Sequence, residues 1–284
     1  MAGPILQFFA LTAEDVEQLE VVGETGTVHE LLEVLPLGVY SALRTFHHER
    51  FLWLDAHFDR TERSMAQLGW PNRLDRELLR RALYRCVGDY PLTDSMVRFD
   101  VLREPAKVQG VSAEVFIALS PYLPVPEEFL RDGVRVELAP HLRRETPRIK
   151  TTEFVRRRRP LPLGTQERYE GVLLDDEQRF LECSSANIAF VRGKQVIAAS
   201  DGVLEGITSL VLQKLAPGLG LEWVDRRLPF KELDQVDEAF LSSSSRGVVP
   251  IVKIEGTKIG NGTVGAQTRA LTAAYYAFAE LESR

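Results

Sequence analysis

A proline-rich segment divides the chain into two parts. Residues 120–126 read Ser-Pro-Tyr-Leu-Pro-Val-Pro, with three prolines in seven positions. Proline neither continues a helix nor donates to a central strand, so such a segment favours a connection. The 284 residues suffice for one large or two ordinary domains. We therefore predict a small α+β domain over residues 1–120, an interdomain linker over 121–128 and a larger domain over 129–284.

Both parts mix strand and helix patterns, which predicts an α+β fold. In the first part the apolar periodicity predicts strands and helices over residues 39–46, 51–54, 55–70, 75–88, 96–103 and 113–119. Asp55 is expected to cap the first helix, and Pro71 with Asn72 to end it. In the second part we expect strands near 134–139, 171–175, 186–191, 195–199, 236–242 and 249–254, with helices over 206–216 and 268–282.

The composition favours a soluble protein of the cytoplasm. Apolar residues make up 44% and charged residues 27%, and the net charge of −6 gives no case for a nucleic-acid surface. The short basic run from Arg156 to Arg159, which Pro160 ends, is therefore interpreted as a solvated face. No apolar stretch approaches the ~20 residues that span a bilayer, and no basic residue precedes the apolar N-terminal piece as in a signal peptide. Two cysteines make no disulfide framework, which fits a reducing compartment.

Four groups of polar residues follow one another in an order that indicates chemistry. Lys150 comes first, and Glu182 stands 32 positions later, as 182 − 150 shows. Gly206-Ile207-Thr208 then opens an expected helix, and serines occupy positions 242–245 at the end of an expected strand. If residues 148–152 form a strand, Ile149 and Thr151 face away from Lys150.

An amine, a carboxylate, a helix start and several hydroxyls are what a protein needs to hold pyridoxal 5'-phosphate (PLP). The amine forms a Schiff base with the aldehyde, and the carboxylate keeps the ring nitrogen protonated. Amides at a helix N-terminus and hydroxyl groups bind the phosphate. Each group also has an ordinary interpretation: a surface lysine, a turn glutamate, a common helix start and a flexible serine loop. No residue pattern indicates a metal site.

The order of these and further motifs resembles one family over roughly residues 36–276. The motifs are Gly38-Val39-Tyr40, His57-Phe58-Asp59-Arg60, Lys150, Glu182 with Ser184-Ser185-Ala186-Asn187, Gly206-Ile207-Thr208, Ser242 to Ser245 with Pro250, and Gly262-Thr263-Val264-Gly265. In this order they resemble the class IV, fold-type IV PLP enzymes. That group contains branched-chain aminotransferases, D-amino-acid aminotransferases, R-selective amine transaminases and aminodeoxychorismate lyases.

The resemblance implies a fold and a set of roles. The fold would be a two-domain fold-type IV architecture, with a small α/β sandwich domain and a larger pseudo-barrel domain that binds the cofactor, normally in a homodimer. Lys150 would be the catalytic Schiff-base lysine, Glu182 the partner of the pyridine nitrogen, and Tyr40 an aromatic residue on the substrate side. The phosphate would be bound by Arg60, Ile207, Thr208, Ser243 and Ser244.

The substrate pocket departs from the subgroups of this family. Ser41 follows Gly38-Val39-Tyr40 where Glu is usual, Ser209 follows the Gly-Ile-Thr turn where Arg is common, and Val155 replaces a tyrosine of branched-chain enzymes. The Arg-x-His carboxylate trap of D-amino-acid aminotransferases is not visible in residues 103–107. Arg98 and Arg44 are candidate ligands for a substrate carboxylate, with a structural or surface role as the alternative for each.

The resemblance predicts an aminotransferase that moves an amino group between an amino acid or amine and a keto acid through Lys150. Branched-chain or related apolar L-amino acids are the first expectation for the donor. The alternative is pyruvate elimination of the aminodeoxychorismate lyase type, toward which the run from Glu182 to Asn187 leans. A non-catalytic cofactor-binding protein is a third possibility, which the presence of both Lys150 and Glu182 disfavours. The expected partners are these small molecules and a second copy of the chain, with no nucleic acid and no membrane.

Overall fold

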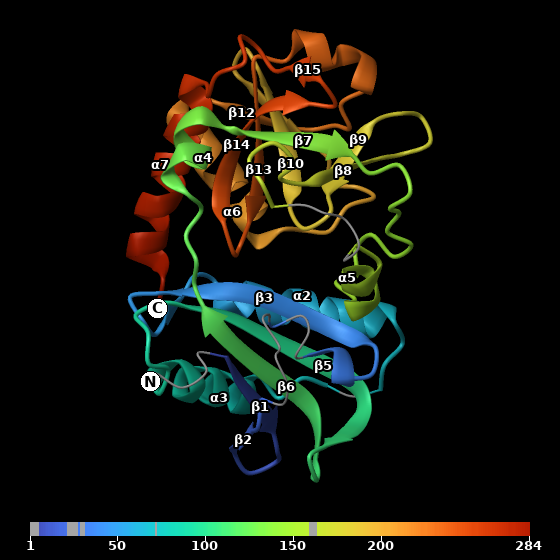
Figure 1. Cartoon of the computed structure of the whole chain (residues 1–284), viewed down its shortest axis with the longest axis vertical. Helices are drawn as coiled ribbons and strands as arrows, with labels where there is room; N and C mark the ends of the chain where they lie inside the picture. Colours follow the sequence, from blue (N-terminus) through green and yellow to red (C-terminus); the bar gives the residue numbers. More distant parts are fainter. Residues whose placement is uncertain (1–5, 22–27, 29–31, 72, 159–163) are drawn as a thin grey trace. The chain divides into compact units, whose positions relative to one another are not determined.

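The computed structural model describes residues 6–21, 28, 32–71, 73–158 and 164–284 (Figure 1). The chain divides into two compact units. Unit 1 comprises Met1–Leu123, Ile149–Arg156 and Glu282–Arg284, and unit 2 comprises Pro124–Arg148 and Arg157–Leu281. Lys150 therefore belongs to unit 1, although most of the chain that follows it belongs to unit 2. Residues 1–5, Asn72, Arg159 and Pro160, on which some expectations rested, lie outside the described residues.

A six-stranded antiparallel sheet forms the centre of unit 1. Its strand order is β2-β1-β6-β5-β3-β4. The strands are β1 (Gln7–Leu11), β2 (Val16–Leu19), β3 (Gly38–Phe46), β4 (Arg50–Phe51), β5 (Ser95–Val108) and β6 (Val111–Pro121). The helical elements are η1 (Leu32–Val34), α2 (Leu54–Gln67), α3 (Arg76–Gly88) and α5 (Thr152–Arg158). The last residues of α5 pass into unit 2.

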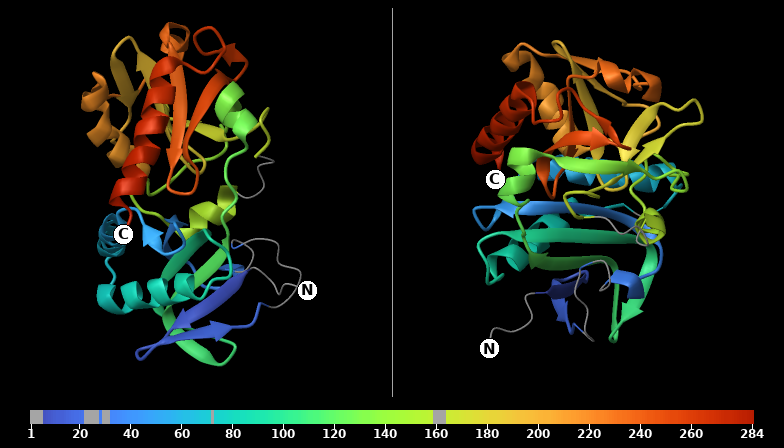
Figure 2. Two further views of the ribbon diagram at one scale, coloured as in Figure 1. Left: turned by 90° about the vertical axis from the view of Figure 1, so that its left-hand side faces the viewer. Right: turned by 45° about the horizontal axis from the view of Figure 1, so that its top comes forward.

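The alternation of side chains along the strands gives this sheet two apolar faces. On one face, Phe9 and Ile117 pack with residues of α2 and α3, such as Phe58 and Leu83, in one buried cluster (Figure 2). On the other face, Phe8 and its neighbours in β6 pack in a second cluster that includes residues of η1. β3 and β5 lie within this sheet and are therefore packed on both of its faces.

The start of α2 differs from the sequence-based expectation. Its N-cap residue is Trp53, which has a left-handed backbone with φ 51°, so Asp55 lies in the first turn and does not cap the helix. The expected strand over residues 51–54 is correspondingly short, because β4 ends at Phe51 and α2 begins at Leu54. Asp55 instead pairs with Arg80 of α3, with Oδ1 and Nη2 2.5 Å apart. Helix α3 has a capping carboxylate, since Asp75 accepts from the Leu78 amide at 2.9 Å.

Unit 2 contains a sheet in which six strands form a barrel. Its strands are β7 (Val134–Leu138), β8 (Gly171–Leu174), β9 (Phe180–Cys183), β10 (Asn187–Arg192), β11 (Gln195–Ala198), β12 (Glu222–Asp225), β13 (Glu238–Ser243), β14 (Gly247–Ile254) and β15 (Thr257–Lys258). The order is β12-β11-β10-β13-β14-β7-β8-β9, and β9 also pairs with β10 through Glu182 and Asn187. Strands β10, β13, β14, β7, β8 and β9 therefore close on themselves.

The barrel of unit 2 encloses an apolar core and is flanked by helices. Val136, Phe180, Ile188, Leu241 and Ile251 belong to one buried cluster. The helical elements are α4 (Glu127–Asp132), α6 (Ile207–Leu215), η2 (Ala216–Leu219), η3 (Phe230–Gln235) and α7 (Ala266–Glu282). Helix α7 packs beside the start of β14, where a side chain at Gly247 would meet Tyr275 and Tyr276 (Figure 2).

The α+β prediction is confirmed, and most expected elements are present. Strands β1, β2, β9, β12 and β15 were not anticipated. The segment around Lys150 is not a strand: Thr151 forms a single bridge with Val39, and α5 begins at the next residue. Among the helices within the described ranges, none is long and apolar enough to cross a membrane.

Candidate active site

Backbone contacts with β3 and α2 fix Lys150 in unit 1. Its carbonyl oxygen accepts from the Tyr40 amide at 3.0 Å, and its own amide donates to Ser64 Oγ at 3.4 Å. The half-buried side chain places Nζ 4.7 Å from the centroid of the Tyr40 ring. An amine against the face of an aromatic ring is an attractive arrangement. The structure thus brings together Lys150 and Tyr40, two of the residues that the sequence singled out.

A close approach at Gly38 holds the segment after Lys150. The Thr152 hydroxyl accepts from the Gly38 amide at 2.8 Å and donates to the Gly38 carbonyl at 3.2 Å. A Cβ at position 38 would lie 2.5 Å from the Val101 carbonyl oxygen of β5, so only glycine fits here without movement of a strand. The close approach of β3 and β5 at Gly38 therefore helps to position the backbone segment that carries Lys150.

Arg60 lies in a buried polar cluster of the same unit. It is 4% exposed, and its Nη2 donates to Ser41 Oγ at 2.8 Å. The same Oγ lies 2.8 Å from His57 Nδ1. Burial lowers the pKa of His57 well below its ordinary value, and the charges of Arg60 and Lys150 lower it further. His57 is thus a neutral ring that supports Arg60 through Ser41.

The first candidate ligand for a substrate carboxylate, Arg98, already has a carboxylate partner. Its Nε and Nη2 donate to the two oxygens of Asp100 at 2.8 and 2.6 Å, and both residues are buried. Its guanidinium carbon lies 4.2 Å from the centroid of the Tyr40 ring. Arg98 is therefore part of the Lys150–Tyr40 group, but a substrate carboxylate would compete with Asp100 for it.

Arg44, the second candidate, is engaged with aromatic rings. Its guanidinium carbon lies 4.1 Å from the ring centroids of both Phe46 and Tyr122. Such contacts favour the structural alternative for this arginine.

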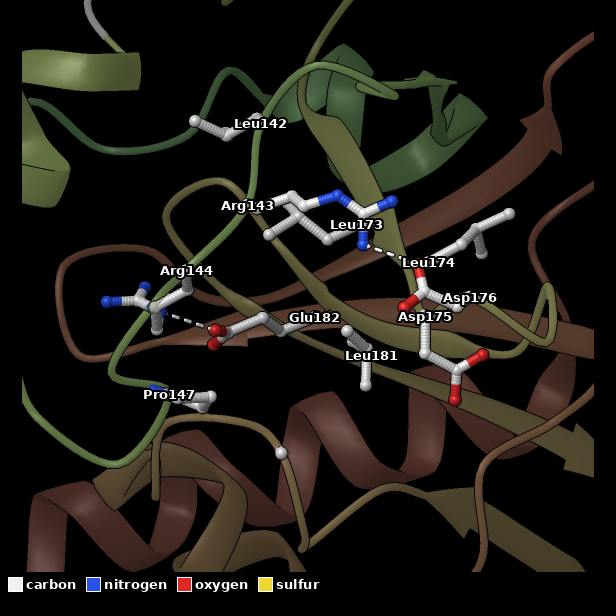
Figure 3. Close-up of a pocket in the computed structure, with 11 residues that line it drawn as sticks. Leu142, Arg143, Arg144, Pro147, Leu173, Leu174, Asp175, Asp176, Leu181 and Glu182 are labelled. Atoms are coloured by element: carbon white, nitrogen blue, oxygen red, sulfur yellow. Dashed lines mark hydrogen bonds and ion pairs between the residues drawn. The ribbon is translucent and has the colours of Figure 1, made fainter.

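Glu182 lies on β9 in unit 2, where it lines a cavity of about 150 Å³ (Figure 3). The side chain is 2% exposed, so its charge needs partners. Arg144 Nε donates to Oε1 at 2.6 Å, and the Leu204 amide donates to Oε2 at 3.3 Å. An ionised carboxylate only accepts hydrogen bonds, which is the chemistry that a pyridinium N–H requires of its partner. Glu182 lies near the end of β9, opposite Asn187 of β10, and its side chain is buried there.

The loop before α6 connects Glu182 with Ile207 and Thr208. Leu204 donates its amide to Glu182, and its carbonyl accepts from Asn187 Nδ2 at 2.8 Å. Gly206 is the N-cap residue, and a Cβ there would collide with Asn187 Oδ1. Ile207 and Thr208 follow in the first turn, where helix amides lack intrahelical partners and attract anions.

Ser243 and Ser244 lie where β13 turns into β14. Register places Glu182 opposite Asn187 and Asn187 opposite Ser242, so Glu182 and the serine turn are two strand spacings apart, about 10 Å. Arg246, in the same turn, donates from Nε to Ser243 Oγ at 3.2 Å and from Nη2 to Glu170 at 2.8 Å. Hydroxyls, first-turn amides and a buried carboxylate are therefore gathered in one unit.

The chemistry of these side chains and backbone amides fits PLP. Unit 2 offers a carboxylate for a ring nitrogen, and amides with hydroxyls for a phosphate. Unit 1 offers an amine and the buried guanidinium of Arg60. The sequence-based reasoning missed Arg144, Glu170 and Arg246, because each acts through a partner far away in the sequence. Asp100 also went unnoticed, although its Arg-x-Asp spacing on one strand face was visible in the sequence.

Comparison with known proteins relates the whole pattern to one family. The family model for class IV amino-transferases matches residues 38–254. Aminodeoxychorismate lyase of Bacillus subtilis is 25% identical over 256 residues, 84% of each chain. D-alanine aminotransferase of Listeria monocytogenes is 26% identical over 260 residues, covering 82% of this chain and 84% of that protein. A branched-chain-amino-acid aminotransferase-like protein of Arabidopsis thaliana is 25% identical over 252 residues.

Some relatives are much longer than their matched region. The match covers 84% of this chain but only 44% of the Arabidopsis protein, and a match to an Aquifex aeolicus relative covers 35% of that protein. The matched region, which in the Aquifex comparison is 38% of this chain, thus spans less than half the length of either relative.

Solved structures share the fold. A fold IV transaminase of Curtobacterium pusillum superposes with a TM-score of 0.77 at 18% identity, covering 98% of this chain and 99% of that one. The PLP form of a branched-chain amino acid aminotransferase of Thermobaculum terrenum gives 0.74 at 20% identity, with coverage of 96% and 93%. The predicted fold-type IV architecture is confirmed. The chain belongs to the class IV aminotransferase family, whose enzymes use pyridoxal 5'-phosphate.

Proposed function

We propose that this protein transfers an amino group between an amino acid, or an amine, and a keto acid, with PLP bound covalently to Lys150. The supporting observation is the fixed position of Lys150. Its carbonyl and amide are both bonded to neighbouring elements, and its Nζ lies 4.7 Å from the Tyr40 ring centroid. A lysine whose backbone is held in this way, with its amine beside an aromatic ring, suits a group that must attach, release and shuttle a proton.

Each further residue has one task in the proposal. PLP supplies an electron-accepting ring that weakens a bond at the substrate Cα. Once the substrate amine has displaced it, Lys150 Nζ would accept the Cα proton and hold it for return to the cofactor. Glu182 holds a proton at the ring nitrogen, and Arg144 keeps the Glu182 carboxylate oriented. Arg60, Ile207, Thr208, Ser243 and Ser244 bind the phosphate, and Tyr40 faces the substrate.

Arg98 and Arg44 remain the candidates for the substrate carboxylate. The contacts of Arg98 with Asp100 and Tyr40 support a role beside the reacting group, whereas the aromatic contacts of Arg44 give it weaker support. Branched-chain or related apolar L-amino acids are the first choice of donor. We further propose that the protein is a homodimer and that it is located in the cytoplasm. The cytoplasmic location agrees with two buried, unpaired cysteines, Cys86 and Cys183.

Absorbance and a donor panel test this function. Wild-type protein incubated with PLP is expected to show the near-visible band of a lysine-linked cofactor, and Lys150→Ala is expected to lack it. Each amino donor that is a substrate should replace that band by the pyridoxamine spectrum. Wild-type protein without the band would contradict the proposal as a whole.

Pyruvate elimination from aminodeoxychorismate is the second candidate, and the relative from Bacillus subtilis favours it. The same preparation decides between the two functions. Pyruvate release without conversion to the pyridoxamine form indicates the lyase. Conversion by amino acids without pyruvate release indicates the aminotransferase.

A further inference from the structure

A buried carboxylate, Glu170, collects donors from two separate turns of unit 2. It stands directly before β8 and is 2% exposed. The hydroxyls of Ser184 and Ser185, in the β9–β10 turn, donate to it. Arg246 Nη2, from the β13–β14 turn, donates to its Oε1 at 2.8 Å. Glu170 is therefore the common acceptor of two turns whose donors, Ser185 and Arg246, are 61 residues apart.

Arg246 extends this network to the proposed phosphate ligands. Its Nη2 also donates to Ser185 Oγ at 2.8 Å and to the Ser185 carbonyl at 3.3 Å. Its Nε donates to Ser243 Oγ at 3.2 Å. The rigid fork of a guanidinium fixes the directions of its donors, so the position of Ser243 Oγ follows from that of Glu170.

The charges in the network favour one orientation of the Ser243 hydroxyl. Burial alone would raise the pKa of Glu170, but the cation of Arg246 and the serine hydrogen bonds outweigh it and hold the pKa below its ordinary value. Glu170 is thus ionised and can only accept hydrogen bonds. Arg246 can only donate, so Ser243 Oγ accepts from it and keeps its own proton for another acceptor. Ser245 Oγ, 3.3 Å away, can take that proton when no phosphate is bound. A hydroxyl that accepts from a cation is also a stronger donor.

We propose that Glu170 and Arg246 are positioning residues for the cofactor phosphate: Glu170 orients Arg246, and Arg246 orients the Ser243 hydroxyl as a donor to the phosphate. The inference rests on the proposed function, because it takes Ser243 as a ligand of PLP. It extends that function to two residues that do not themselves touch the cofactor. Their effect is specific to the phosphate and spares the ring.

The test compares PLP with pyridoxal, which has the same ring and aldehyde but no phosphate. Both are titrated into the full-length apoprotein, and the absorbance of the lysine-linked form gives each dissociation constant. In Glu170→Gln and Arg246→Lys, the preference for PLP over pyridoxal is expected to fall about tenfold, as for loss of one hydrogen bond to a charged group. The affinity for pyridoxal is expected to stay at the wild-type value.

Arg168→Lys is the matched control. Arg168 pairs with Glu137 at 2.6 Å close to Glu170 in the sequence, but both side chains are nearly half exposed. This variant should keep the wild-type preference for PLP. Equal loss of affinity for both compounds in the Glu170 and Arg246 variants would show a merely structural role and overturn the inference, as would an unchanged preference.

A double variant covers the case in which a single change prevents folding. Glu170→Gln combined with Arg246→Met removes both charges, so no unpaired charge stays buried. It should fold, bind pyridoxal like the wild type and lose the preference for PLP. Retention of the full preference would overturn the inference alone. A wild-type protein that binds neither compound would overturn the proposed function, and the two failures are therefore distinguishable.

Discussion

At the scale of single residues, Ser41 determines how the charge of Arg60 is used. Its hydroxyl accepts from Arg60 and lies 2.8 Å from His57 Nδ1. Arg60 Nη2 also lies 3.5 Å from Nδ1, which suits a neutral ring whose Nδ1 accepts and whose proton is on Nε2. A glutamate at position 41 would add a negative charge beside Arg60, whereas Ser41 accepts a hydrogen bond from it without adding a charge.

His57 gives a prediction about pH. Its pKa is lowered by burial and by the charges of Arg60 and Lys150, so between the folded pKa and about 6.5 the unfolded chain binds more protons than the folded one. Stability is then fully present above pH ~6.5 and lost as pH falls. Relative to His57→Gln, the wild type should lose about 1 kcal/mol of unfolding free energy between pH 8 and 5.5. Urea unfolding of both proteins measures this; parallel pH profiles would contradict it.

The Arg98–Asp100 pair gives a second prediction. Removing one partner strands a buried charge, so Arg98→Met should lower the free energy of unfolding by about 3 kcal/mol, and Arg98→Met with Asp100→Leu should recover much of that loss. Chemical denaturation of the single and double variants measures both effects. If Arg98 instead serves mainly to bind the substrate carboxylate, its replacement will raise KM and leave stability nearly unchanged.

At the scale of elements, the spacing of β3 and β5 controls the segment that carries Lys150. A Cβ in Gly38→Ala would lie 2.5 Å from the Val101 carbonyl oxygen, so the strands must separate, at a cost of about 1–3 kcal/mol. The bonds between Gly38 and Thr152 should weaken with it, and with them the affinity for PLP. Gly218→Ala is the control, since nothing lies within 4 Å of a Cβ there. Equal stability of the two variants in urea would exclude this account.

Elements with a regular apolar period could be predicted from the sequence, whereas contacts that depend on packing could not. The helix over residues 75–88 and the strands of Val39 and Phe116 were recognised from their side-chain alternation. The start of α2 was placed wrongly, because a capping aspartate at position 55 is locally favourable, while the left-handed Trp53 is set by tertiary packing.

The candidate site shows the same division. Lys150, Glu182 and the serine turn could be identified because their residue types and order indicate one cofactor. The Glu170–Arg246 pair could not, since no periodicity connects residues 76 positions apart. In the sequence, Asp100 looks like an ordinary strand residue. Its role becomes apparent in the structure, where Arg98 pairs with it. Sequence therefore singles out candidate cofactor ligands better than the groups that hold those candidates in place.

At the scale of the whole molecule, cofactor binding should stabilise the chain. A ligand that binds only the folded state at 100 times its dissociation constant adds about 2.7 kcal/mol to the free energy of unfolding. Thermal unfolding with saturating PLP should show this increase in the wild type and much less of it in Lys150→Ala, which keeps only the non-covalent contacts. An equal increase in both proteins would show that Lys150 contributes little to binding.

The barrel of unit 2 closes through one residue pair, Glu182 opposite Asn187. A seam this narrow is held by fewer ladder hydrogen bonds than the other strand pairs, so amide exchange should report its opening before that of β13 and β14. Strands that open there draw Glu182 away from Arg144 and Leu204. Closure of this seam therefore also sets the position of the Glu182 carboxylate, so opening of the seam and loss of that position should go together.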